Sequence, residues 1–447
     1  MSVDFSRIIR VTNGVAGEGT DMEKQFELFT TDSREINEQN ALFVAFKGEK
    51  NDAHDYLGAV LEKGNTGALI EDPAFLTANT VLVKSSRKAL QDIAKDYREN
   101  ELKNTVCIGI TGSVGKTTAK EMTVKCISCG KTVSYTQGNR NSQVGLPRTV
   151  LEVPEGTEAA VFEMGMSLPG EMERIAVCAQ PDIVMIINIG TSHIEAFGTR
   201  EGIRDEKLNI LKGLREGGKI IVNGDEPLLA DIPNAIKCGI DNSQNQVYAY
   251  NIEKDGETTV FDVNLFGKVF RARIGAIGKH MVYDALFAFA AGHLLGLTPE
   301  MMCNSLVDFK SVGDRQRIIS KDGVRIIADC YNASPESVSA ALDVLGGFDG
   351  RKIAVLGDML ELGDHSPSLH TAVGKKALEK ADMLVCIGEQ SKNTAAAFGK
   401  EAVCFDADQG EKAAEYIKNK VLAGDTVLFK GSRGMRLESV MKKVFDI

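Results

Sequence analysis

One run of eight residues has the side-chain types and the spacing to hold a phosphate group. Gly112 and Gly115 allow backbone N–H groups to converge on phosphate oxygens, and a helix beginning after them adds a favourable dipole. Lys116 would neutralise charge on the β- and γ-phosphates, and the Thr117 hydroxyl would bind Mg²⁺. The general motif has a further glycine where this chain has Ile110, so an ordinary glycine turn before a helix is the alternative. The predicted nucleotide-binding residues of this run are Thr111, Gly112, Ser113, Val114, Gly115, Lys116, Thr117 and Thr118.

Two further polar side chains follow apolar runs at the point where a strand would end. Glu163 comes directly after Ala159–Phe162, and His193 follows Ile183–Ile189. Because parallel strands end at the same edge of a sheet, both would face the nucleotide phosphates. Taken alone, Glu163 is equally well a turn or helix cap, and His193 a hydrogen-bonded loop residue. Together with a phosphate loop they favour Mg²⁺ binding, for which the oxygen-bearing Glu163 is the better ligand.

The architecture that would position these side chains is a mostly parallel sheet flanked by helices. Thr105–Ile110 is a short β-branched apolar run, typical of a buried strand, and the glycine turn and a helix follow it directly. Other apolar runs alternate with helical patterns, which indicates an α/β fold. After about Val312 the pattern restarts as a second βαβ series of Rossmann-like topology that lacks the fingerprint Gly-x-Gly-x-x-Gly. The predicted strands of this second series are Arg325–Ala328, Lys352–Leu356, Met383–Ile387, Val403–Phe405 and Thr426–Lys430.

Length and composition bound the class of protein. The 447 residues correspond to roughly three domains at about 150 residues each, which we place at 1–86, 87–314 and 315–447. The net charge of −10 disfavours nucleic acid and anionic membranes as partners. Nine scattered cysteines, an odd number, favour a reduced, cytoplasmic location. The longest apolar run, Ala285–Leu297, is too short to span a bilayer and predicts a buried helix, so we expect no membrane insertion.

A Cys126-x-x-Cys129 pair lies in the helix that follows the phosphate loop. Zinc sites of this type need a second ligand pair, and the chain has no other Cys-x-x-Cys. Ala119, Met122, Cys126 and Cys129 are spaced as one apolar stripe, with Gly130 as the C-terminal cap. We therefore favour a buried helix face over a metal or redox site.

These motifs resemble the Mur ligases, ATP-dependent amide-forming enzymes of peptidoglycan precursor synthesis, over essentially the whole chain. Thr111–Thr118 matches the phosphate loop of that family, including the shortened glycine spacing. The strand ends at Glu163–Gly165 and Asn188–Glu195 match its metal-binding segments. The resemblance implies that Glu163 and His193 hold Mg²⁺, and that Lys207, in a charged segment otherwise typical of a solvated helix face, is carbamylated and becomes a metal ligand.

Three segments are similar to the family member that adds D-alanyl-D-alanine to UDP-N-acetylmuramoyl-tripeptide. Asp32–Arg34, Phe43–Gly48 and Asp52–Asp55 resemble its UDP-sugar domain. Asp329–Pro335 resembles a motif near nucleotide and acceptor, and Val355–Gly363 resembles its acceptor segment. The residues carried over are Ser33, Arg34, Lys47, Gly48, Asp358 and Glu361 for substrate, and Asp284, Arg315, Asp329 and Asn332 for nucleotide.

Several of these carried-over residues have an alternative reading. Asp284 stands where the family has asparagine, so it can accept a hydrogen bond from the adenine amino group but cannot donate one as asparagine can. The alternative for Arg315 is a surface arginine, and the alternative for Asp358 and Glu361 is a solvated acidic loop.

The resemblance implies that ATP and Mg²⁺ are needed, and that the three domains serve UDP-sugar, ATP and acceptor. The tripeptide carboxylate would attack the γ-phosphate, and the amine of D-alanyl-D-alanine would then displace phosphate from the acyl phosphate. We expect a monomer that binds no nucleic acid. A nucleotide-dependent switch protein and a folylpolyglutamate synthase are the alternatives; the Asp32–Arg34 region argues against the second.

Overall fold

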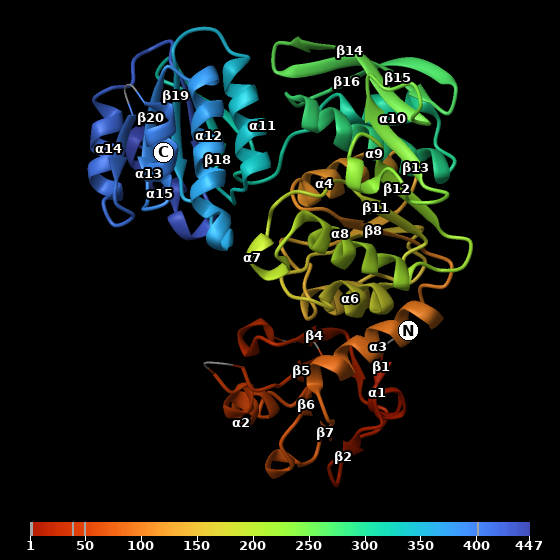
Figure 1. Cartoon of the computed structure of the whole chain (residues 1–447). Helices are drawn as coiled ribbons and strands as arrows, with labels where there is room; N and C mark the ends of the chain where they lie inside the picture. Colours follow the sequence, from red (N-terminus) through yellow and green to blue (C-terminus); the bar gives the residue numbers. More distant parts are fainter. Residues whose placement is uncertain (1–2, 38–39, 49–50, 400–401) are drawn as a thin grey trace. The chain divides into compact units, whose positions relative to one another are not determined.

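A computed structural model describes residues 3–37, 40–48, 51–399 and 402–447 (Figure 1). The chain divides into two compact units. The first consists of Met1–Thr111, Lys131–Val184 and Glu206–Lys219, and the second of Gly112–Gly130, Met185–Asp205 and Ile220–Ile447. The strands form separate N-terminal, central and C-terminal sheets, and the division into units passes through the central one, so the three predicted domains stay a prediction.

The N-terminal part of the first unit is a small sheet with the order β2-β7-β6-β5-β4. Its inner strands are parallel, and β2 is antiparallel at the edge. Helix α2 packs on β6, and α3 packs against α1. The elements are β1 (Val3–Asp4), α1 (Phe5–Thr12), β2 (Val15–Ala16), β3 (Gln25–Phe26), β4 (Leu28–Thr30), β5 (Ala41–Val44), α2 (Leu57–Leu61), β6 (Thr66–Ile70), β7 (Thr80–Leu82) and α3 (Ser86–Asn100).

The rest of the first unit supplies the strand that leads into the phosphate loop. β8 (Val106–Thr111), β10 (Ala159–Glu163) and β9 (Val133–Tyr135) are parallel neighbours in that order. All residues of β10, and all of β8 except Val106, are buried, as expected for parallel strands covered on both faces, whereas the residues of the edge strand β9 are partly buried. Helices α5 (Gly145–Leu151) and α6 (Glu171–Ala179) pack against α3 and against each other.

The second unit begins with the phosphate loop and α4 (Lys116–Ile127), which packs against α9 (Lys279–Leu294) and α10 (Pro299–Leu306). α9 is the buried helix predicted over Ala285–Leu297, although it begins and ends earlier. A feature that the sequence did not predict is the antiparallel extension β14-β15-β16, which follows the parallel strands β12 and β13. These strands are β12 (Lys219–Asn223), β13 (Ile236–Ile240), β14 (Val247–Asp255), β15 (Thr258–Leu265) and β16 (Lys268–Ile274).

Three elements, β11 (Ile183–Ile186), α8 (Arg200–Leu208) and β12, contain residues of both units. The short helix α7 (Ile194–Phe197) lies between β11 and α8 in the sequence and belongs to the second unit.

The C-terminal part of the second unit is the predicted Rossmann-like layer, with strand order β17-β18-β22-β19-β20-β21. Strands β18, β19 and β20 of this sheet are labelled in Figure 1. All pairs except β17 with β18 are parallel. Residues of α14 and α15 fill the core on one face of the sheet. The elements are β17 (Arg317–Lys321), β18 (Val324–Asp329), α11 (Pro335–Gly346), β19 (Lys352–Gly357), α12 (Ser366–Lys380), β20 (Met383–Ile387), α13 (Ser391–Phe398), β21 (Ala402–Phe405), α14 (Gly410–Lys418), β22 (Thr426–Lys430) and α15 (Leu437–Phe445).

The prediction for the Cys126-x-x-Cys129 pair was half wrong. Cys126 is fully buried on α4, as predicted, but α4 ends at Ile127 with Ser128 as its C-cap. Cys129 therefore lies beyond the helix and is exposed, so it is not part of the apolar stripe. Among the residues that the structure describes, no group of three or more His, Cys, Asp and Glu side chains is arranged to hold a metal ion.

Candidate functional site

The phosphate loop connects β8 to α4 through backbone that only glycine accommodates well. Gly115 has φ +82° and is the N-cap of α4, which is the left-handed conformation that glycine favours. A Cβ at Gly112 would lie 2.4 Å from Ile187 Cγ1, which is sterically impossible without movement. The loop thus leads directly into a helix N-terminus, where unpaired N–H groups favour an anion. Lys116 folds back over this loop and donates from Nζ to the Gly112 carbonyl at 2.8 Å.

Asn188, to which we had given no separate role, holds the loop from the segment after β11. Its Oδ1 accepts hydrogen bonds from the amides of Ser113 at 2.9 Å and Val114 at 3.0 Å. Its Nδ2 donates to the Val114 carbonyl at 2.8 Å, and Ser113 Oγ accepts from the Gly190 amide at 2.9 Å. The Asn188 amide side chain therefore makes three of the hydrogen bonds that order the loop. The signal in the sequence is that Asn188 begins the segment Asn188–Glu195, which resembles a metal-binding strand end of the family.

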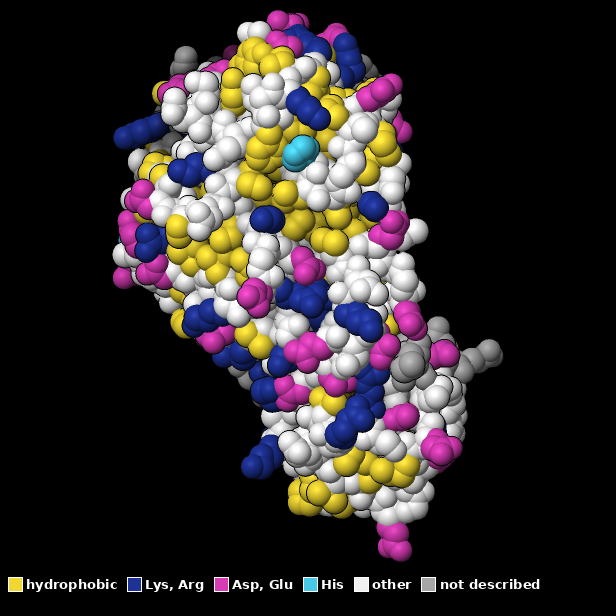
Figure 2. Space-filling model, turned by 90° about the vertical axis from the view of Figure 1, so that its right-hand side faces the viewer, with side chains coloured by type: hydrophobic (Ala, Val, Ile, Leu, Met, Phe, Trp, Pro, Cys, Tyr) yellow, Lys and Arg dark blue, Asp and Glu magenta, His cyan; other side chains and the backbone are white. Residues whose placement is uncertain are grey.

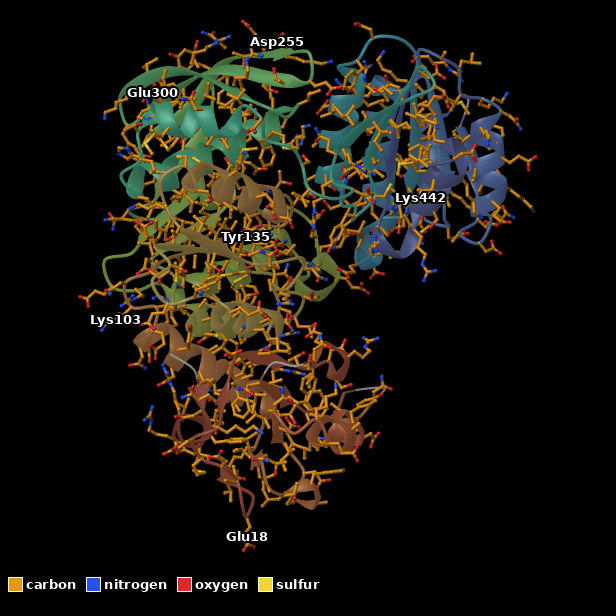
Figure 3. All side chains as sticks on the ribbon, turned by 180° about the vertical axis from the view of Figure 1, so that it is seen from behind. Glu18, Lys103, Tyr135, Asp255, Glu300 and Lys442 are labelled. Atoms are coloured by element: carbon orange, nitrogen blue, oxygen red, sulfur yellow. The ribbon has the colours of Figure 1, made fainter. Side chains whose placement is uncertain are left out.

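Glu163 ends β10 in the first unit and is 3% exposed. Its register partner on β8 is Ile110, which precedes Gly112 by two residues, so Glu163 lies close to the start of the phosphate loop. Glu163 Oε1 accepts from Asn141 Nδ2 at 2.7 Å. The Glu163 amide donates to Thr136 Oγ1 at 3.0 Å. Thr136 directly follows Tyr135, which is labelled in Figure 3. The prediction that this carboxylate stands at the end of a parallel strand is confirmed.

Lys207 lies on α8 and is 2% exposed, so the solvated-face reading of this part of the helix is wrong. The neighbouring Glu206 is also buried and accepts hydrogen bonds from the amides of Gly170 and Met172, each at 2.9 Å. Glu206 thereby caps the N-terminus of α6. Because Lys207 is buried beside this carboxylate, a modification that changes the charge of the lysine would strongly change the local electrostatics.

His193 and Glu361 meet in the second unit, although the sequence assigned them to metal and to substrate respectively. His193 Nδ1 lies 2.5 Å from Glu361 Oε2. The hydrogen bond from His193 lowers the pKa of the Glu361 carboxyl. Both residues have positive φ, +65° and +63°, at the turns that present their side chains. With Nδ1 bonded to a carboxylate, the imidazole presents Nε2 as its ligand atom.

Asp358 follows β19, as predicted, but it is 7% exposed rather than part of a solvated loop. Its Oδ1 accepts from the Ser391 amide at 2.7 Å, at the first residue of α13. The next amide, that of Met359, donates to Nε2 of the buried His370 at 3.1 Å. The segment that carries Asp358 is therefore fixed by buried hydrogen bonds.

The Asp329–Pro335 motif is organised by Lys430, which the sequence did not single out. Lys430 is 2% exposed, and its Nζ lies 2.7 Å from Asp329 Oδ2 and 3.0 Å from the Asn332 carbonyl. Arg315, predicted to touch phosphate, stacks on the Tyr331 ring with its guanidinium carbon 3.8 Å from the centroid. Just after the motif, Glu336 accepts from the Thr191 amide at 2.8 Å.

Asp284 lies on α9 and is 6% exposed. A Cβ built on Gly115 would be 3.9 Å from Asp284 Oδ1, so the carboxyl lies beside the phosphate loop. No hydrogen bond or ion pair to this carboxyl is present among the described residues, and burial raises its pKa well above the usual value. A protonated carboxyl can donate as well as accept, as an amide does.

The four residues predicted to bind the sugar nucleotide lie on two turns at one edge of the N-terminal sheet. Ser33 and Arg34 follow β4, while Lys47 and Gly48 follow its parallel neighbour β5. The hydrogen bonds from Arg34 to Asp32 lower the pKa of that carboxyl to about 2. The Arg34 side chain is otherwise exposed.

Charge on the molecular surface is mixed. On the face shown in Figure 2, Lys and Arg side chains are interspersed with Asp and Glu side chains. Phosphate binding by this acidic chain therefore depends on the local loop rather than on a broad basic field. In the described part of the chain, no helix has the length and apolar character needed to cross a membrane.

The strand, the glycine loop with its lysine, and the helix define an α/β protein that binds nucleotide phosphates. Family comparison is more specific. Residues 110–292 match the Mur ligase middle domain, and residues 314–433 match the Mur ligase glutamate ligase domain. The chain belongs to the Mur ligase family.

Individual relatives cover nearly the whole chain. The UDP-N-acetylmuramoyl-tripeptide--D-alanyl-D-alanine ligase of Bacillus subtilis (strain 168) is 38% identical over 93% of this chain and 92% of the relative. A crystal structure of MurF from Acinetobacter baumannii has a TM-score of 0.93 at 28% identity, covering 100% of this chain and 99% of that one. MurF ligase from Thermotoga maritima, solved in complex with ADP, has a TM-score of 0.86 at 29% identity, covering 94% and 97%.

Proposed function

We propose that this chain is an ATP-dependent ligase that joins D-alanyl-D-alanine to UDP-N-acetylmuramoyl-tripeptide, giving UDP-N-acetylmuramoyl-pentapeptide, ADP and phosphate. The observation that carries the proposal is the 38% identity, over 93% of this chain, to a relative of that name. The phosphate loop and the solved relative that holds ADP support ATP as the nucleotide. We further propose three domains, 1–86 for UDP-sugar, 87–314 for ATP and 315–447 for the acceptor.

Two displacements make the amide bond. The terminal carboxylate oxygen of the tripeptide attacks the γ-phosphorus of ATP, the bond to the β-phosphate oxygen breaks, and ADP leaves an acyl phosphate. The dipeptide amine then attacks the acyl carbon and loses a proton, and the C–O bond to phosphate breaks. Phosphoryl transfer of this kind depends mainly on positioning and on neutralising charge.

The residues of this chain take roles that follow from their positions. The loop from Gly112 to Gly115 presents backbone amides and the N-terminus of α4 to the phosphates. Lys116 is within reach of the same loop and would move from the Gly112 carbonyl to a phosphate oxygen. Asp284 beside Gly115 would contact the nucleotide in its protonated form.

The donor atoms fit Mg²⁺. A buried carboxylate at a strand end, Glu163, and a hydroxyl in the first turn of α4, Thr117, are the oxygen ligands that Mg²⁺ prefers. We propose that these two residues, His193 and carbamylated Lys207 hold the metal. When bound, Mg²⁺ neutralises charge on the phosphate oxygens. Glu361 orients His193, and buried Lys430 holds the segment that carries Asp329 and Asn332.

The decisive assay is phosphate release together with product mass. Release should require ATP, Mg²⁺, the tripeptide nucleotide and D-alanyl-D-alanine together, and the product should have the mass of the pentapeptide nucleotide. Lysine- and diaminopimelate-containing tripeptides are tested side by side, since the third residue is not specified by the observations above. ATP turnover without the dipeptide, or stimulated by a protein alone, would refute the proposal and favour a nucleotide-dependent switch.

Two lysine variants test the proposed roles. Lys116→Ala should abolish phosphate release, whereas Lys103→Ala, an exposed lysine labelled in Figure 3, should not change it. Lys207→Ala should be inactive and should regain activity with an added short-chain carboxylate. A fully active Lys207→Ala would contradict carbamylation.

We also propose that the protein is a cytoplasmic monomer. All nine cysteines are free, as expected in a reducing compartment. Light scattering on the purified chain tests the monomer.

A further inference from the structure

Two cysteines outside the proposed active site lie opposite each other in the C-terminal sheet. Cys386 on β20 and Cys404 on β21 are register partners on parallel strands. Register partners on adjacent strands point to the same face of a sheet, and the strands are about 4.8 Å apart. This spacing falls within the Cα–Cα range of about 4.4–6.8 Å that a disulfide requires.

The two thiols differ in their exposure. Cys386 is fully buried, whereas Cys404 is exposed. The two thiols lie close enough for each to shift the pKa of the other. Lys392 of α13 lies close enough to act on Cys404, while its Nζ is 3.2 Å from Asp406 Oδ1. An exposed thiol beside a cation, with a buried thiol in contact, is the arrangement of an attacking and a resolving cysteine.

The charges around the pair favour ionisation of the exposed member. The hydrogen bond from Cys386 and the ammonium of Lys392 lower the pKa of Cys404 to about 7, against burial and Asp406. The same hydrogen bond, burial and Asp358 raise the pKa of Cys386. The other seven cysteines all have a raised pKa, with burial as the main cause. They are Cys107, Cys126, Cys129, Cys178, Cys238, Cys303 and Cys330.

We propose that Cys386 and Cys404 form a two-thiol redox site that a hydroperoxide converts to a disulfide between β20 and β21. This site is independent of the ligase activity proposed above. The Cys404 thiolate attacks one peroxide oxygen, the O–O bond breaks, and the leaving oxygen takes a proton and departs as water or an alcohol. The Cys386 sulfur then attacks the Cys404 sulfenic acid, loses its proton, and displaces the hydroxyl as water. Two electrons pass from the two thiols to the peroxide.

Only one strand pairing has to adjust when this bond forms. β21 is the edge strand and pairs only with β20 among the strands described. The hydrogen bonds between β20 and β21 are therefore the ones that a shift of β21 would change. Just past the pair, the Gly388 amide donates to the Phe405 carbonyl at 2.9 Å, which keeps the two strand ends together.

The test oxidises the folded full-length chain with dilute hydrogen peroxide and then blocks the remaining thiols. The expected result is a loss of two thiols, a mass decrease of about 2 Da from the two hydrogens removed, and a linked peptide containing Cys386 and Cys404 that dithiothreitol separates. Cys404→Ser should abolish the linked peptide. Cys386→Ser should leave a sulfenic acid on Cys404 that dimedone traps.

A matched control is Cys129→Ser, which removes an exposed thiol near the buried Cys126 and should leave the linked peptide unchanged. Lys392→Gln should slow alkylation of Cys404 near pH 7 by about threefold, because removal of the cation raises the thiol pKa. The proposal is overturned if the folded wild-type chain forms no Cys386–Cys404 link, or if Cys404 reacts no faster than Cys129.

Discussion

Removal of the Asn188 side chain tests the phosphate site without changing any residue of the loop itself. Besides the backbone bond from the Ser113 amide to the Asn188 carbonyl, at 3.3 Å, the Asn188 side chain makes three hydrogen bonds to the loop: to the amides of Ser113 and Val114, at 2.9 and 3.0 Å, and to the Val114 carbonyl, at 2.8 Å. Asn188→Ala deletes all three. We expect the loop to lose its order while β11 and α4 remain in place.

The size of the effect follows from those contacts. A hydrogen bond contributes about 0.5–1.5 kcal/mol net, so three correspond to about 1.5–4.5 kcal/mol. Val114 is half-buried, and water can replace part of the loss in the resting protein. We therefore expect the free energy of unfolding to fall by about 1–2 kcal/mol. The remainder, about 0.5–2.5 kcal/mol, is lost when ATP must order the loop, which corresponds to a fall in kcat/KM for ATP of about 2–70-fold.

Two matched variants separate the ordering of the phosphate loop from the effect of a negative charge beside it. Asn188→Asp keeps an acceptor for both loop amides but places an anion where phosphate is expected, so it should retain most of the stability and still lose ATP binding. Two like charges about 5 Å apart repel by about 3 kcal/mol at an effective dielectric constant of 20, which allows a loss of about 100-fold. Asn223→Ala removes one hydrogen bond to the Asp225 amide away from the loop, and should leave kcat/KM for ATP unchanged.

The assays are urea unfolding and initial rates of phosphate release at varied ATP concentration. The reasoning is refuted if Asn188→Ala unfolds more easily but keeps its kcat/KM for ATP. It is equally refuted if Asn188→Asp binds ATP as well as the wild type. Either result would mean that Asn188 supports the sheet edge and not the phosphate-binding conformation.

Three further changes probe stability. Burial raises the pKa of Asp284, so the folded protein keeps a proton that the unfolded chain releases. Stability is therefore lost as pH rises above the pKa of the unfolded chain. Asp284→Asn should raise the urea midpoint more at about pH 8 than at about pH 5. Burial lowers the pKa of His370, so stability is lost as pH falls below about 6.5, and His370→Gln should make the urea midpoint less dependent on pH between about 7 and 5. In Gly213→Ala the new Cβ would lie 2.1 Å from the Ala176 carbonyl oxygen, so the unfolding free energy should fall by about 1–3 kcal/mol, whereas Gly58→Ala, with open space, should not destabilise.

The strands of this fold could be predicted from the sequence because buried parallel strands are continuous apolar runs. Met383–Ile387 and Thr426–Lys430 are strands with the predicted limits. The antiparallel strands β14 to β16 could not be predicted in the same way. They are half-exposed, and their alternation of apolar and polar residues gives a weaker signal than a continuous run.

The phosphate loop is the part of the site that sequence specifies best, because all its functional atoms come from neighbouring residues. The partners of the other site residues could not be found this way. Lys430 lies 101 positions from Asp329, and Glu361 is 168 positions from His193, and neither pair has a spacing that predicts contact. Lys430 carries no motif of its own, and the segment that begins at Asn188 does not show which loop atoms Asn188 holds; only the folded sheet brings them to their partners.

These contacts converge on one short segment, residues 188–193. Asn188 and Gly190 bind the phosphate loop, Thr191 binds Glu336 at the start of α11, and His193 binds Glu361 after β19. The segment therefore connects the nucleotide-phosphate loop to two parts of the chain that the family places in the ligase domain. A ligand that moves the phosphate loop therefore also moves a segment that is already bonded to both of those parts. In an enzyme that must protect an acyl phosphate from water, such a segment offers a physical means for ATP binding to influence the acceptor residues.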